Sequence, residues 1–171
     1  MIQDHVQRNL TSQERSRYKD VELQPLLGGR EFGFRFLYHV KWAMAKFDFR
    51  YLLRIDDDYF LCLKRLLFEL PTRPKKNLVW GYFHCQAGIT WIDEAFMIFS
   101  KDIIQKFVAQ NESTMLCHPH ADQQVSLWLK NISNKIFFHD IRLHNDPPAS
   151  FSHKFDNIKN VCDSYLGVHG A

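Results

Sequence analysis

The stretch Tyr51-Leu-Leu-Arg-Ile-Asp56-Asp57-Asp58-Tyr-Phe60 joins a short apolar run to three consecutive carboxylates. The apolar run has the length of a β-strand, so we expect a strand that ends at the acidic triplet. Adjacent like charges repel one another, and a fold keeps them at low cost only where water or a cation neutralises them. Carboxylate oxygens suit Mg²⁺, Mn²⁺ or Ca²⁺. The triplet therefore predicts a metal site at a strand end, with a solvated acidic turn as the alternative.

Helical and strand patterns alternate on both sides of this stretch. Apolar residues recur at three- and four-residue intervals from Phe34 to Phe47, which predicts an amphipathic helix. Further along we expect helices over 63–70, 101–110 and 125–132 and strands over 78–83, 95–99 and 135–143. This alternation predicts a single domain of the α/β class over residues 1–171, with helices packed against a sheet and a polar stretch over 1–17.

The composition excludes several classes of protein. A chain of 171 residues with 46% hydrophobic and 24% charged residues has the makeup of a globular domain. The formal net charge of +3 is small and its Lys and Arg residues are dispersed, so we expect no nucleic-acid polymer as a partner. No stretch approaches the ~20 apolar residues that span a bilayer, and the first residues are too polar for a signal peptide. We therefore expect no membrane anchor within this chain.

Two features suit the secretory pathway. Asn9, Asn111 and Asn131 each begin an Asn-x-Ser/Thr acceptor pattern for N-glycosylation, and all lie in polar stretches. The cysteines also permit two disulfides in an oxidising compartment, with three possible connectivities, although free buried thiols would fit equally well. These cysteines are Cys62, Cys85, Cys117 and Cys162.

The residues around the triplet resemble those of the β-1,3-galactosyltransferase and Fringe-like enzymes, glycosyltransferase family 31, in which the triplet follows a strand in a pattern like Tyr-Leu-Leu-Lys-Thr-Asp-Asp-Asp-Val-Phe. The similarity continues in order from Tyr18-Lys-Asp20 through Ala121-Asp122-Gln-Gln-Val-Ser-Leu-Trp-Leu129 to Val168-His169. It implies a GT-A-like mixed sheet flanked by helices. Nothing before Tyr18 resembles the family's first nucleotide-binding strands, so we expect only part of that fold here.

The resemblance also implies roles for single residues. Asp56 and Asp58 would be the ends of an Asp-x-Asp motif that holds Mn²⁺ or Mg²⁺ against the diphosphate of a UDP-sugar, and His169 would complete the metal site. Arg54 and Asp57 would lie on the donor side. Asp122 would be the catalytic base, although without the resemblance it would be expected to be a helix cap or a first-turn acid.

One departure from the family's pattern bears on the substrates, and one alternative set of residues bears on the metal. Where the family often has a Gly-rich run, this chain has Asp93 and Glu94, whose charge and bulk replace close backbone approach. These carboxylates could bind the acceptor through its sugar hydroxyls. A different metal site is also conceivable, because two cysteines and two histidines offer the ligands of a closed zinc site, although their spacing fits no usual zinc pattern. They are Cys117, His118, His120 and Cys162.

The resemblance thus implies an inverting, metal-dependent hexosyltransferase. It would move galactose or an N-acetylhexosamine from a UDP-sugar to a glycan or glycoprotein acceptor, with a β-1,3 linkage, in protein glycosylation. The resemblance implies the luminal domain of a type II Golgi membrane protein whose anchor is absent from this chain. The alternatives are an inactive carbohydrate-binding relative or fragment and, as a third reading, a metal-dependent phosphohydrolase.

Overall fold

The computed structural model describes residues 13, 16, 17, 32–56, 58–116, 120–144 and 158–169. Several residues singled out from the sequence lie outside this part of the chain, namely Asn9, Asp57, Cys117 and His118. The backbone of His169 is described, whereas its side chain is not.

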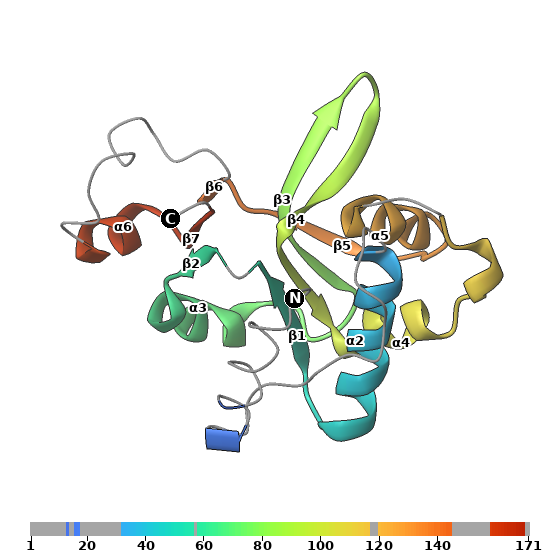
Figure 1. Cartoon of the computed structure of the whole chain (residues 1–171). Coiled ribbons are helices and arrows are strands. Elements are labelled where there is room, and N and C mark those ends of the chain that lie inside the picture. Colours follow the sequence, from blue (N-terminus) through green and yellow to red (C-terminus); the bar gives the residue numbers. More distant parts are fainter. Residues whose placement is uncertain are drawn as a thin grey trace.

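A mixed sheet runs through the centre of the described part of the chain (Figure 1). Its strands lie in the order β1 (Tyr51–Ile55), β4 (Ile89–Ser100), β3 (Leu78–Gln86) and β5 (Ile136–His139). Strands β1 and β3 run antiparallel to β4, whereas β5 runs parallel to β3. The expected sheet of mixed strand directions is therefore confirmed.

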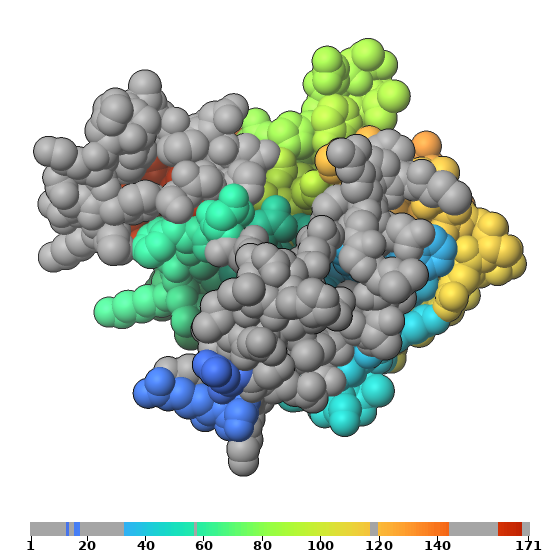
Figure 2. Space-filling model, viewed as in Figure 1, coloured from blue at the N-terminus to red at the C-terminus, as the bar shows by residue number. Residues whose placement is uncertain are grey.

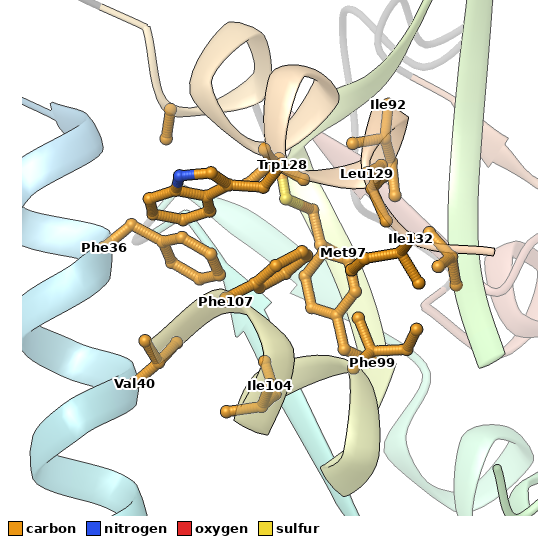
Figure 3. Close-up of a cluster of buried hydrophobic side chains, with 14 of the residues drawn as sticks. Phe36, Val40, Ile92, Met97, Phe99, Ile104, Phe107, Trp128, Leu129 and Ile132 are labelled. Carbon is orange, nitrogen blue, oxygen red and sulfur yellow. The ribbon is translucent and has the colours of Figure 1, made fainter. Parts of the chain in front are cut away.

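Helices α2 (Phe32–Lys46), α4 (Lys101–Val108) and α5 (Ala121–Lys130) cover one face of this sheet, which we call the helix-covered face. Their buried side chains meet those of β4 in a shared core (Figure 3). The side chains drawn there include Phe36, Met97, Phe99, Phe107 and Trp128. The expected α/β arrangement with flanking helices is thus confirmed.

Aromatic contacts dominate this core. The ring of Phe107 is fully buried and lies 5.2 Å, centroid to centroid, from the rings of both Phe99 and Trp128. Phe36 from α2 stacks near Trp128 at 6.3 Å. Burying one such side chain stabilises a fold by about 1.5–3 kcal/mol, so this cluster fixes the three helices on the sheet.

A second, smaller sheet lies beside the other face. Its strands follow the order β2 (Tyr59–Leu61), β7 (Gly167–His169) and β6 (Leu143–His144). Helices α3 (Leu63–Glu69) and α6 (Ile158–Ser164) flank it, as Figure 1 shows. The sequence patterns did not predict this sheet, because strands this short show no periodicity.

A disulfide and a group of ion pairs hold this second region together, and we call them the C-terminal clamp. Cys62 is bonded to Cys162. The guanidinium of Arg142 makes paired hydrogen bonds of 2.7 Å to both carboxylate oxygens of Glu69 and further bonds to Asp140. Asp140 is almost fully buried and also accepts a hydrogen bond from the indole of Trp80. The clamp therefore ties β6, α3 and α6 to the central sheet.

Three boundaries differ by four residues or more from the sequence-based expectations. The strand expected over 95–99 begins at Ile89, because it is the return arm of a hairpin with β3 whose turn has positive φ at Ala87 and Gly88. The strand expected over 135–143 ends at His139. The helix expected from 125 begins at Ala121.

The remaining short elements are the 3₁₀ helices η1 (Leu70–Thr72), which contains Pro71, and η2 (Glu112–Thr114). Asn111, which caps η2, and Asn131, which follows α5, are both exposed, as a glycosylation acceptor must be. Within the described ranges, every helix is too short or too polar to cross a lipid bilayer.

Candidate functional site

The acidic triplet follows β1, as expected, and its described members lie at the edge of the sheet. The Arg54 Nη2 and Asp56 Oδ1 atoms are 2.9 Å apart. The backbone N–H of Asp56 donates to the carbonyl of Ala95 on β4, at 3.2 Å. Asp58 is exposed at the turn that leads into β2. One aspartate of the pair thus already faces a cation, while the other is open to solvent.

Strand β7 brings the end of the chain to this turn. In the antiparallel register of β2 and β7, His169 lies opposite Tyr59, the residue that follows Asp58. Gly167 is required in this pairing, because a Cβ atom there would lie only 2.2 Å from the ring of Tyr59. The backbone of His169 is therefore adjacent to the acidic turn, although more than a hundred residues separate them in the sequence.

Asp93 and Glu94 lie on β4 where its pairing with β3 is irregular, between the partners Gly81↔Met97 and Phe83↔Ile92. Asp93 is buried; its Oδ1 accepts the N–H of Ala95 at 2.8 Å, and its Oδ2 lies 2.5 Å from Nε2 of His84. The irregularity places these two carboxylates beside the backbone bond that joins β4 to Asp56.

Glu94 connects β4 to the start of α5. Its Oε2 accepts the N–H of Ala121 at 3.1 Å, and its Oε1 lies 3.0 Å from Nδ1 of His120. A carboxylate near a helix N-terminus satisfies free backbone N–H groups and is favoured by the helix dipole. The carboxylate that accepts a backbone N–H at the start of α5 thus belongs to Glu94 on β4, whereas His120 occupies the N-cap position.

Asp122 lies in the first turn of α5, and its side chain does not cap the helix. It is buried, and its Oδ1 accepts the N–H of Gln123 at 2.7 Å. Burial raises the pKa of this carboxyl above its usual range, and the negative charge of Glu94 raises it further. A buried carboxyl with a raised pKa beside other titratable groups is typical of an acid–base residue.

Glu94, His120 and Asp122 form a compact group, in which one ligand atom from each lies within 4.8 Å of the others. Two carboxylates and an imidazole can hold a divalent cation. Sequence analysis did not find this group, since 26 residues separate Glu94 from His120. The weak local signal was the spacing of His120 and Asp122.

The zinc site considered from the sequence is wrong in one of its ligands. Cys162 is bonded to Cys62, so its thiolate is not available to a metal. His120 instead faces the carboxylate of Glu94. Cys85 is free and exposed.

The negative charge of Asp93 acts on one residue next to the acidic turn, Tyr59, and on one residue of α5, Asp122. Burial raises the pKa of Tyr59, and the charge of Asp93 adds to this effect. The same carboxylate contributes to the raised pKa of Asp122. The geometric link between the turn after β1 and the start of α5 runs through β4, because the carbonyl of Ala95 accepts from Asp56 and the carboxylate of Glu94 accepts from Ala121.

A shallow cleft of about 590 Å³ lies at the other end of β1, lined in part by Phe49, Tyr51 and Lys101. Asp56 follows the opposite end of β1 from this cleft. The charged side chains of the cleft include the ion pair of Lys101 with Asp48. The cleft therefore contains none of the site residues indicated by the sequence.

The structure thus brings Asp56, Asp58 and the backbone of His169 together, and joins them through β4 to Asp93, Glu94 and Asp122. Asp57 lies outside the described residues. No family model matches this chain, and no curated protein matches it either.

Proposed function

We propose that this chain carries the metal- and acceptor-binding part of an inverting, UDP-sugar-dependent hexosyltransferase of the GT-A type, similar to the β-1,3-galactosyltransferases. The observation that carries the proposal is the pairing of β2 with β7, which sets His169 opposite Tyr59 and so next to Asp58. A metal site at this turn needs a further ligand beside the aspartates, and the pairing brings the backbone of a histidine there.

The donor atoms at the turn suit a hard divalent cation. The Asp58 carboxylate is exposed, and the Asp56 carboxylate already pairs with the positive charge of Arg54. Oxygen ligands with an imidazole suit Mn²⁺, and oxygen ligands alone suit Mg²⁺. Asp56, Asp58 and His169 would hold the ion, which would supply charge stabilisation for the departing diphosphate.

Asp122 acts as the general base in this proposal. It takes the proton of the acceptor hydroxyl while that oxygen attacks the anomeric carbon and the bond from this carbon to UDP breaks, which inverts the configuration. A base is most effective when its pKa approaches the working pH. Burial and the charge of Glu94 move the pKa of Asp122 in that direction.

The disulfide between Cys62 and Cys162 supports a place in the secretory pathway, since such bonds persist in oxidising compartments. We propose that the chain acts in the Golgi lumen, on glycans or glycoproteins, as part of a membrane-anchored protein. The exposed Asn111 and Asn131 fit the same setting.

The test is isothermal titration with UDP, with and without Mn²⁺. We expect wild-type binding to require Mn²⁺ and Asp58→Ala to abolish it. The matched control is Asp48→Ala, since Asp48 is an exposed aspartate at the opposite end of β1. If folded wild-type chain does not bind UDP with Mn²⁺, donor binding by this chain is refuted, and an inactive carbohydrate-binding relative or fragment becomes the better reading.

A metal-dependent phosphohydrolase is the second candidate, and the Glu94–His120–Asp122 group favours it because such enzymes often use a second ion. Hydrolysis of the diphosphate bond of a UDP-sugar to UMP and a sugar phosphate without any acceptor, lost in Glu94→Gln, would support it. Transfer that requires an acceptor sugar would exclude it.

A further inference from the structure

The hairpin formed by β3 and β4 carries aromatic rings on one side. The rings of His84 and Trp91 are stacked, with centroids 5.2 Å apart and planes inclined by 20°. The ring of Tyr82 meets His84 edge-on at 5.0 Å. We call these three half-buried side chains the hairpin aromatic face. Figures 1 and 2 show that the hairpin projects from the body of the molecule.

The hairpin aromatic face begins at the candidate site. Asp93, two residues after Trp91 on β4, binds Nε2 of His84 through its Oδ2. The next residue, Glu94, binds the start of α5 beside Asp122. Two neighbouring carboxylates therefore link the rings to the start of the helix that carries the proposed base.

Stacking across a two-stranded ribbon stabilises the ribbon itself, and this would explain the contact of His84 with Trp91. It does not explain why a buried carboxylate ends the row of rings. Aromatic faces beside a few fixed polar groups are the usual lining of a small-molecule site. A sugar ring suits this lining, because it has an apolar C–H face and hydroxyl groups at its edge.

We propose that the hairpin aromatic face binds one pyranose unit of the acceptor glycan. The indole of Trp91 contacts the apolar face of the sugar, and the His84–Asp93 pair hydrogen-bonds its hydroxyls. That the bound sugar is the acceptor rests on the proposed function. Binding of a pyranose by these residues does not depend on it.

The experiment is ligand-observed saturation-transfer NMR with methyl β-galactoside and methyl β-N-acetylglucosaminide, without UDP or metal. We expect at least one glycoside to bind wild-type chain, and Trp91→Ala to weaken its binding by about tenfold or more, since a ring contact is lost. Trp91→Phe keeps a ring and should retain most of the affinity. This variant separates loss of the ring from loss of the hairpin.

Phe137→Ala is the matched control. Phe137 is half exposed on β5 and contacts Phe83, which belongs to the helix-covered face of the sheet, opposite Tyr82. We expect it to bind the glycoside as wild type does. The proposal is overturned if wild type binds neither glycoside, if Trp91→Ala binds as well as wild type, or if Phe137→Ala or Trp91→Phe weakens binding as much as Trp91→Ala.

The two proposals fail in different ways. If UDP does not bind while glycoside binding depends on Trp91, the transferase is refuted and the sugar site stands. If UDP binds with Mn²⁺ while glycoside binding is the same in Trp91→Ala as in wild type, the sugar site is refuted and the donor site stands.

Discussion

The helix-covered face and the C-terminal clamp hold their parts of the molecule by different means. The first buries a cluster of aromatic and aliphatic side chains between three helices and the sheet. The second also buries an apolar cluster, which includes Tyr59, Leu66 and Leu166, but its strands have only two or three residues and a disulfide and ion pairs reinforce it. Short strands bury too little apolar surface to persist alone. The proposed metal site is therefore built on the region in which covalent and charged contacts reinforce the apolar packing.

Removal of Phe107 should have the largest effect on stability. Phe107→Ala empties a fully buried position between Phe99 and Trp128, so we expect a loss of about 3–5 kcal/mol in the free energy of unfolding. Urea unfolding followed by fluorescence measures it. Phe68→Ala is the control, since Phe68 is 82% exposed. Equal losses in both variants would contradict the comparison.

Removal of the disulfide should come next. The bond closes a sequence separation of 100 residues, and loss of such a crosslink costs about 2–5 kcal/mol, mostly through the unfolded chain. We expect Cys62→Ser/Cys162→Ser to lose UDP binding at lower urea than the helix-covered face unfolds. Cys85→Ser should leave both transitions unchanged. A single coincident transition in the double variant would show that the two regions unfold together.

Arg142→Ala should have a smaller effect, of about 3 kcal/mol, because it leaves the buried Asp140 without its cation. Lys41→Ala, which removes an exposed ion pair with Glu112, should cost less than about 1 kcal/mol.

Hydrogen bonds from Arg142 lower the pKa of Glu69 to about 2. The stabilisation from ionised Glu69 is thus complete above the usual carboxyl pKa and disappears as the pH falls towards about 2. Wild-type unfolding at several acidic pH values should show this loss, and Arg142→Ala should show a smaller one, because Arg65 and Arg73 still pair with Glu69.

The smallest effect concerns the pH profile of transfer. Glu94→Gln removes a negative charge that raises the pKa of Asp122, while an amide oxygen remains to accept the N–H of Ala121. We expect the acid limb of kcat to move to lower pH, only in part, because burial is the larger cause of the raised pKa. Glu112→Gln, at an exposed site, should leave the profile unchanged. An unmoved limb in Glu94→Gln would argue against Asp122 as the base.

The sequence predicted well where a pattern is local. The spacing from Phe34 to Phe47 predicted α2, and the apolar run before Asp56 predicted β1. It could not predict the partner of β2, because the match between Tyr59 and His169 depends on where the chain returns. The hydrogen bond between Glu94 and the start of α5 could not be predicted either, because it joins two segments that are distant in the sequence. The resemblance to a family supplied the roles of the site residues, and these remain predictions.

Cys62 and Cys162 also have a consequence for biosynthesis. A chain made from its N-terminus exposes Cys62 long before Cys162 has been synthesised, and Cys85 appears in the interval. Cys85 stays free and exposed in the folded chain, so it is available as a wrong partner throughout that delay. The correct bond can form only once Cys162 has been made, and any Cys62 that has already paired with Cys85 must then reach it by exchange between thiols and disulfides. In those chains, maturation of the β2–β7 pair should be limited by that exchange rather than by collapse of the aromatic core.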